Sequence, residues 1–140
     1  MPRQLIIEAD GGSRGNPGIA AGGAVVIDGE TQQVLCTVGV FVGVATNNVA
    51  EYNGLVAGLS AAYDIDPDAF VHVRMDSKLV VEQMSGRWKI KHPDMATLAA
   101  TAREIIGNRA VTYEWVPRLQ NALADAAANK SMDAQASFST

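Results

Sequence analysis

Four acidic residues stand at the boundaries between predicted elements, where side chains from distant parts of a chain can meet. Asp10 and Asp76 each follow an apolar run. Glu51 and Asp125 each lie near the start of a segment with helical periodicity. Carboxylates without a suitable histidine or cysteine set favour hard cations, Mg²⁺ or Mn²⁺, over zinc. Two such ions roughly 3.5–4 Å apart can activate a water and stabilise the leaving oxygen in phosphodiester cleavage.

Each acidic residue also has an ordinary interpretation. Asp76 could belong to a helix-start turn, and Asp125 could complement the positive end of a helix dipole. Glu51 is three residues after Asn48 and could close a capping box. Glu51 nevertheless shares a helical stripe with Leu55, which should face the sheet. A carboxylate that leans towards the core is costly unless a cation or hydrogen-bond donors meet it.

The apolar pattern predicts an α/β fold in which helices flank a mixed sheet. Asp28-Gly29 between two apolar runs is a strong hairpin signal, so the first three strands should form an antiparallel meander. Later strands are joined through helices, which favours parallel pairing. Strands are expected over 5–10, 24–27, 34–41, 70–75 and 111–116, and helices over 49–63, 78–84, from 93 to about 107, and from 121 onward. Candidate N-caps are Thr46 to Asn48 for the first helix, Ser77 for the second and Asn121 for the last.

The segment after Asp10 is rich in small residues. Gly11 to Gly18 contains four glycines, a proline, an asparagine and a serine. Glycine has no Cβ and tolerates positive φ, so such a segment is typical of a loop that lets backbone approach a ligand. The sequence therefore predicts a glycine loop with the Asp10 carboxylate at its edge.

One basic and aromatic patch interrupts an otherwise acidic chain. The net charge of −4 argues against a broad nucleic-acid-coating surface. Arg87, Lys89 and Lys91 nevertheless surround Trp88, and positive charge beside a stacking ring suits a nucleic-acid backbone and its bases. The alternative is a solvated connector with one half-buried tryptophan. Together with the acidic set, the patch favours metal-assisted phosphoryl chemistry on a nucleic acid.

Length and composition predict one globular domain. The chain has 140 residues, of which 48% are apolar and 19% charged. The single cysteine, Cys36, favours a reducing, cytoplasmic setting, and no run suggests a membrane span or signal peptide. The expected layout is a catalytic domain over 1–130 and a polar, flexible tail over 131–140.

Four ordered segments resemble the signature of type 1 ribonuclease H. They are Asp10 to Gly18, Thr46 to Tyr52, Asp76-Ser77 and Asn121 to Asp125. The resemblance runs from about Leu5 to Lys130. It implies a five-stranded mixed sheet, three antiparallel strands then two parallel, and a nuclease that cuts the RNA strand of an RNA–DNA hybrid, leaving a 5′-phosphate and a 3′-hydroxyl.

The resemblance also assigns roles by position. Asp10, Glu51, Asp76 and Asp125 match the four metal-binding carboxylates, which implies two Mg²⁺ or Mn²⁺ ions. The expected substrate contacts are Gly11, Gly12, Ser13, Asn16, Thr46, Asn47, Arg87, Trp88 and Lys89. Among these, Asn16 and Thr46 match positions that hold nucleic-acid backbone, and Asn47 matches a reader of the minor groove. Taken alone, Asn16 could be a turn former and Asn47 an alternative N-cap.

Two departures from the family pattern are visible. Only Pro117 to Ala124 separate the last strand from Asp125, and this loop lacks the histidine that many relatives carry there. Arg118 is its only cation and is the candidate substitute, although a solvated loop arginine is the alternative. Between Met84 and Pro93, longer relatives insert a helix and a basic handle that this chain lacks.

Three functions stay in play on the sequence alone. The first is a metal-dependent endoribonuclease acting on RNA–DNA hybrids. The second is a nuclease of the same fold that acts on duplex RNA or DNA junctions. The third is a non-catalytic hybrid-binding module, which the complete carboxylate set disfavours because four negative charges would repel phosphate. A monomer is favoured in each case.

Overall fold

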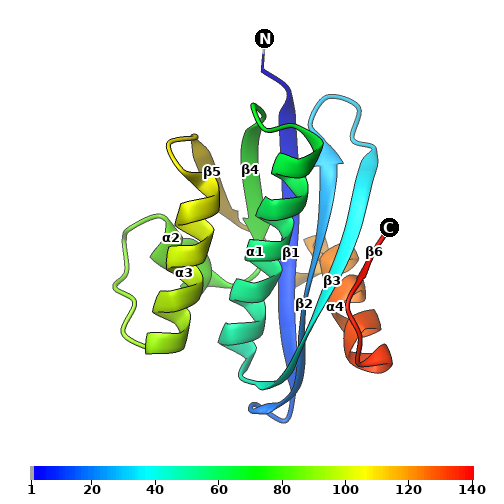
Figure 1. Cartoon of the computed structure of the whole chain (residues 1–140), viewed down its shortest axis with the longest axis vertical. Helices are drawn as coiled ribbons and strands as arrows, with labels where there is room; N and C mark the ends of the chain where they lie inside the picture. The colour runs from blue at the N-terminus through cyan, green and yellow to red at the C-terminus, as the bar shows by residue number, and fades with distance from the viewer. Residues whose placement is uncertain (1) are drawn as a thin grey trace.

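The computed structural model describes residues 2–140, which form one six-stranded sheet between two layers of helices (Figure 1). The strands are β1 (Gln4–Arg14), β2 (Gly18–Asp28), β3 (Val34–Ala45), β4 (Phe70–Met75), β5 (Val111–Trp115) and β6 (Phe138–Ser139). The helices are α1 (Asn47–Ile65), α2 (Lys78–Met84), α3 (Pro93–Ile106) and α4 (Ala122–Ala134), with a 3₁₀ turn η1 (Arg118–Gln120) before α4.

The sheet has the expected mixed topology, in the order β5-β4-β1-β2-β3-β6. Strands β1, β2 and β3 pair antiparallel through hairpins, whereas β4 pairs parallel with β1 and β5 pairs parallel with β4. Helices join β3 to β4 and β4 to β5, which allows the parallel pairs. The sixth strand, β6, pairs antiparallel with β3 and was not expected.

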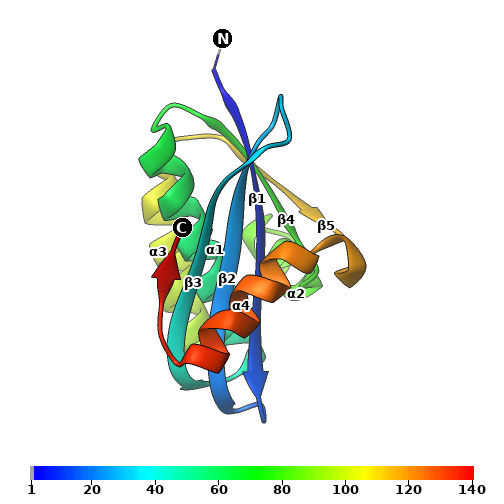
Figure 2. The same cartoon turned by 90° about the vertical axis from the view of Figure 1, so that its right-hand side faces the viewer.

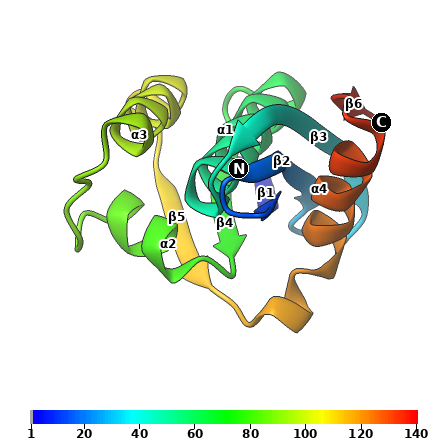
Figure 3. The same cartoon turned by 90° about the horizontal axis from the view of Figure 1, so that it is seen from below.

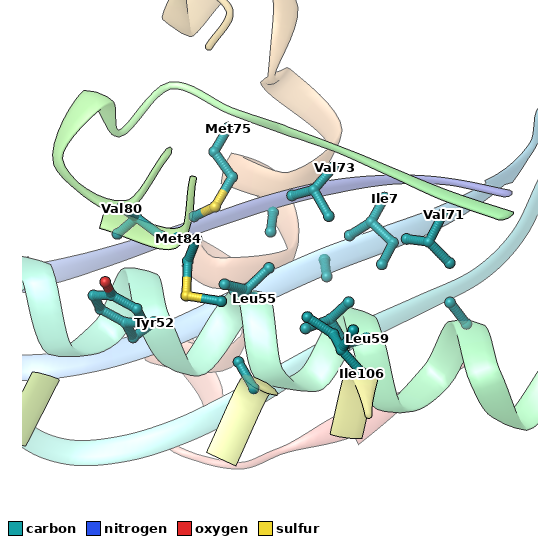
Figure 4. Packing of buried hydrophobic residues seen from close by; sticks show 14 of the residues in the cluster. Ile7, Tyr52, Leu55, Leu59, Val71, Val73, Met75, Val80, Met84 and Ile106 are labelled. Carbon is teal, nitrogen blue, oxygen red and sulfur yellow. The ribbon is translucent and has the colours of Figure 1, made fainter. Parts of the chain in front are cut away.

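Helices cover the two faces of the sheet unequally. Helix α1 packs on β1 and β2, and α3 packs against α1, so these helices share one face. Helix α4 lies on the opposite face, across β1, β2 and β3 (Figures 2 and 3). Figure 4 shows the main core, where sheet residues such as Ile7 and Val73 meet Tyr52, Leu55 and Leu59 of α1.

The predicted glycine loop is wrong for its first half. Strand β1 continues past Asp10 to Arg14, with Gly11 opposite Gly22 of β2, so only residues 15–17 form a turn. Gly11 is required by packing: a Cβ there would lie 2.2 Å from the backbone carbon of Ala50 in α1. The glycine therefore allows a helix, rather than a ligand, to approach the backbone.

The expected helix caps differ in outcome. Of the candidates Thr46 to Asn48, Thr46 caps α1, and its hydroxyl accepts the Val49 N–H at 3.3 Å. Helix α1 has no acidic residue in its first turn, so Glu51 does not close a capping box. Asn121 precedes α4 but makes no capping hydrogen bond with its side chain. The predicted Ser77 cap of α2 is confirmed, with the Val80 N–H donating to its hydroxyl at 3.3 Å.

The last ten residues, expected as a loose tail, pack on the domain. Helix α4 continues to Ala134, and β6 follows along β3. The Thr37 and Thr140 backbones exchange two hydrogen bonds, at 2.9 and 2.8 Å. Within residues 2–140, no helix combines the length and apolarity that crossing a bilayer would require.

Candidate active site

The structure brings all four predicted carboxylates to one pocket of about 360 Å³. Asp10 comes from β1, Glu51 from α1 and Asp125 from the first turn of α4, while Asp76 directly follows β4. The full lining is Asp10, Gly11, Gly12, Ser13, Arg14, Asn47, Glu51, Asp76, Arg118, Asp125, Asn129 and Met132. Residues far apart in the sequence thus build one strongly acidic site.

Sheet register and close helix packing place these carboxylates. Ala9 pairs with Met75, so the residues that follow, Asp10 and Asp76, leave the β1–β4 ladder side by side. Helix α1 approaches β1 so closely that a Cβ on Gly54 would lie 2.2 Å from the main-chain oxygen of Asp10. Glu51 is three residues before Gly54, about one helical turn. The glycine contact therefore brings Glu51 to the site.

Asp10 is the most perturbed carboxyl group of the pocket. It is 7% exposed. Burial, together with the neighbouring charges of Asp76 and Asp125, raises its pKa to about 8, against a hydrogen bond from the Gly11 backbone. A carboxyl group in such surroundings holds a proton near neutral pH unless a cation compensates the negative charge.

Glu51 follows the same physical rule. Burial, with a smaller contribution from the charge of Asp76, raises its pKa to about 7, while a hydrogen bond with Ser77 opposes the rise. Clustered carboxyl groups with raised pKa values are typical of functional sites, because ordinary folding stability does not require like charges to be buried together. Ser77 thus both caps α2 and supports Glu51.

The donor set fits hard divalent cations. Carboxylates dominate the pocket, and its lining contains no cysteine or histidine. Within residues 2–140, no three acidic, histidine or cysteine side chains are grouped closely enough to hold one metal ion by themselves. An open carboxylate site suits Mg²⁺, which keeps several waters and is usually held by one or two carboxylates together with substrate phosphates. Asp10, Glu51, Asp76 and Asp125 are the side chains that would hold it.

Asn121 is a site residue that the sequence indicated as a helix cap and as the first residue of the fourth signature segment, without a role in the site. Its side chain is fully buried, and Nδ2 donates to the main-chain oxygen of Ala9 at 2.8 Å and to Oδ1 of Asp76 at 3.1 Å. Its own Oδ1 has no hydrogen-bond partner within residues 2–140. Asn121 therefore ties the start of α4 to β1 and orients Asp76.

A chain of amides joins the β1–β2 turn to α1. The Ser13 N–H donates to Oδ1 of Asn47 at 2.8 Å, and the Asn47 N–H donates to Oδ1 of Asn16 at 3.0 Å. The Ser13 hydroxyl donates to the Ala45 carbonyl oxygen at 2.6 Å. Ser13 and Asn47 line the pocket, whereas Asn16 and Thr46 do not. Asn16 thus contributes by holding Asn47.

The basic connector, residues 85–92, lies away from the pocket lining. Arg87, Trp88 and Lys89 are exposed and do not line the pocket, and Figure 3 shows this segment passing from α2 to α3. The Arg87 guanidinium forms two hydrogen bonds to the Glu82 carboxylate, which lowers the pKa of Glu82. That ion pair offsets part of the positive charge expected from the sequence.

Two arginines line the pocket. Arg118, on η1, has its Nη2 4.0 Å from Oδ1 of Asp125. Arg14, which the sequence did not single out, forms an ion pair with Asp133 of α4 at 2.6 Å and lies 3.4 Å from Oδ1 of Asn129. A cation inside the glycine-rich segment was the available signal for Arg14. Asn129 and Met132 had none, because only the packing of α4 brings them here.

The fold and this acidic pocket define a class of protein. Comparison with known proteins identifies that class. A family model described as "Reverse transcriptase-like" matches residues 8–131. The bifunctional protein Rv2228c of Mycobacterium tuberculosis is 54% identical over 134 residues, which cover 95% of this chain and 36% of that protein. The chain therefore spans little more than a third of this relative.

Two solved structures narrow the class. The N-terminal RNase H domain of Rv2228c from M. tuberculosis has a TM-score of 0.89 and 53% identity, covering 94% of this chain and 95% of that chain. LC11 RNase H1, solved in complex with an RNA/DNA hybrid, has a TM-score of 0.88 and 36% identity, covering 94% and 99%. The chain belongs to the type 1 ribonuclease H family.

Proposed function

We propose that the protein is a divalent-metal-dependent endoribonuclease that hydrolyses the RNA strand of RNA–DNA hybrids. The products would carry a 5′-phosphate and a 3′-hydroxyl. The observation that carries this proposal is the meeting of four carboxylates from four elements in one pocket, two of them with strongly raised pKa values. The similarity to LC11 RNase H1, which was solved with a hybrid, supports the choice of substrate.

The four carboxylates would hold two Mg²⁺ or Mn²⁺ ions. Such ions, when bound, supply a polarised water and neutralise charge on the reacting phosphate. Asp10 and Glu51 would release their protons to bind cations, because their raised pKa values reflect uncompensated negative charge. Asn121 would keep Asp76 in its binding orientation through the 3.1 Å hydrogen bond.

Recognition of RNA would come from the backbone of residues 11–13 and from Asn47. RNA differs from DNA by its 2′-hydroxyl groups, which an A-form helix displays in a wide, shallow minor groove. Gly11, Gly12, Ser13 and Asn47 all line the pocket. Asn47 uses its Oδ1 to accept the Ser13 N–H, so its NH₂ group is the part that a hydroxyl or base edge would meet. Asn16 and Thr46 would hold this surface in place and contact the backbone.

The basic connector would bind phosphate at a distance from the reaction. Trp88 is 46% exposed and Lys89 is exposed, as a stacking ring and a phosphate ligand must be. Arg87 would contribute less, because Glu82 already pairs with it. On the other side, Arg118 lies at the pocket next to Asp125 and is the candidate to assist the reaction where relatives carry a histidine.

One assay tests the proposal. Labelled RNA–DNA hybrid, duplex RNA and duplex DNA are each incubated with Mg²⁺, Mn²⁺ or EDTA, using wild type and Asp10→Asn. Metal-dependent cutting of the hybrid alone, lost in Asp10→Asn, supports it. Cutting of duplex RNA in preference to hybrid would identify a different nuclease, and binding without metal-dependent cutting would identify a binding module.

A further inference from the structure

A buried chain of hydrogen bonds joins the helix that carries Glu51 to the basic connector. Tyr52 follows Glu51 in α1, is fully buried, and donates its hydroxyl to Oε1 of Gln83 at 2.7 Å. Gln83, on α2, is 4% exposed, and its Nε2 donates to the main-chain oxygen of Lys89 at 3.1 Å. The path runs from the pocket wall to the peptide of a predicted phosphate-binding lysine.

Backbone hydrogen bonds within residues 2–140 hold the two ends of the connector. The N–H groups of Arg87 and Trp88 both donate to the Glu82 carbonyl oxygen, at 3.0 and 3.2 Å. At its far end, Nδ1 of His92 accepts the Asp94 N–H and caps α3. Among residues 2–140, the Gln83 amide is the side chain that reaches the connector backbone between these two anchors. Ile90 packs against the core, and the Gln83 amide adds a directional contact at the neighbouring Lys89 peptide.

The hydrogen bond from the Gln83 amide to the Lys89 main-chain oxygen is suited to orienting the connector. Apolar side chains pack around Tyr52, with Leu55, Val80 and Met84 in the same cluster (Figure 4). Apolar side chains of similar shape would fill the same space, because replacing both partners of a buried hydrogen bond with apolar groups is often nearly neutral. Apolar packing has no preferred direction, whereas a hydrogen bond from the amide to one peptide oxygen does. The hydrogen bond can therefore fix the position of an exposed segment.

We infer that Gln83, oriented by Tyr52, is a positioning residue that fixes the basic connector relative to the carboxylate pocket. Its effect would be to hold Lys89 and Trp88 where the backbone of a bound hybrid passes. This inference rests on the proposed function, and it adds a link between substrate binding and the helix of the reaction site. A nucleic acid held at the connector would thereby be kept in register with the pocket.

The test uses the double variant Tyr52→Phe/Gln83→Met, which removes both polar groups while keeping side-chain shape. Its melting temperature should stay near that of wild type. The KM for a labelled RNA–DNA hybrid should rise about three- to tenfold with little change in kcat, because a binding surface loses its fixed position. Backbone amides of residues 85–92 should exchange with deuterium faster in the free protein, and those of α1 should not.

Tyr63→Phe is the matched control. Tyr63 is a second buried tyrosine of α1, and its hydroxyl has no hydrogen-bond partner within residues 2–140. Wild-type KM and wild-type exchange over 85–92 are expected for this variant. A double variant with unchanged KM and unchanged exchange would overturn the inference, as would an equal fall in kcat and in kcat/KM.

Lys89→Ala separates the inference from the proposed function. A raised KM for Lys89→Ala, with an unchanged double variant, would remove Gln83 from the mechanism and leave the nuclease proposal standing. A wild-type KM for Lys89→Ala would show that the connector does not hold substrate, which overturns the inference. An inactive wild-type protein would instead reject the proposed function itself.

Discussion

The carboxylate pocket and the basic connector are built in opposite ways. The pocket takes one acidic residue from each of four separate parts of the chain, and sheet register together with close glycine contacts fixes them. The connector is a single, largely exposed segment, held by a few backbone bonds, one buried amide and the packing of Ile90 against the core. The pocket must keep like charges together and therefore needs a rigid scaffold. A segment that would bind phosphate does not bury like charges together, so a few contacts are enough to hold it.

The largest difference between the two regions should be seen in the chemical step. Asp76→Asn removes one of the four proposed metal-binding carboxylates and should lower kcat on hybrid by about 10²-fold or more, because the carboxylate would hold a cation that neutralises charge on the reacting phosphate. Asp64→Asn, an acidic change elsewhere on α1, serves as the control and should keep wild-type kcat. Equal activity of the two variants would mean that the acidic pocket is not the reaction site.

Asn121 supports the pocket without being one of its carboxylates, so its contribution can be tested separately. Asn121→Ala removes hydrogen bonds to Ala9 and Asp76 and leaves a small cavity, so the free energy of unfolding should fall by about 1–3 kcal/mol. Calorimetric titration with Mn²⁺ should also show weaker binding. Ser131→Ala is the matched change, since Ser131 is equally buried in α4 and, within residues 2–140, its hydroxyl donates to the Ala136 carbonyl oxygen and to no part of the pocket. Mn²⁺ affinity equal in both variants would deny Asn121 its role in orienting Asp76.

The strain in the pocket predicts a specific pH dependence of stability. The pKa of Asp10 is raised from 3.8 to about 8, so the native state keeps a proton that the unfolded state releases. Stability should therefore fall as the pH rises from about 4 to about 8, and this cost is complete above pH 8. In EDTA, Asp10→Asn should be more stable than wild type at pH 8–9, by about 1–3 kcal/mol, and close to it at pH 4. Denaturant titrations at both pH values measure the difference; a constant gap would exclude this cause.

The connector should respond more weakly, and to salt rather than to pH. Lys89→Ala should raise KM for hybrid a fewfold and reduce the slope of log K against log salt by about one, as expected for one lost phosphate contact. Arg87→Ala should change the slope less, because Glu82 already pairs with Arg87. Identical slopes for wild type and Lys89→Ala would remove the connector from the phosphate contacts.

Regular elements and acidic residues were predictable because local physics places them. Apolar runs ending at Asp10 and Asp76 required only a parallel pair to bring their ends together, and the Ser77 cap and the helix opened by Pro93 followed local rules. The glycine segment was misread because the residues that suit a loop also suit a strand crossed closely by a helix. The helix that crosses Gly11 is α1, and strands β2 and β3 lie between the two in the sequence.

By itself, the sequence determined which groups can do chemistry, namely the four carboxylates and a basic segment with a tryptophan. It also determined the order of the main strands and helices. The tertiary structure decided how those groups act. It raised the pKa values of Asp10 and Glu51, turned Asn121 from a cap into a support for Asp76, and paired Arg87 with Glu82. These outcomes depend on how deeply each side chain is buried and on which side chains lie next to it. Burial and side-chain contacts exist only once the chain has folded.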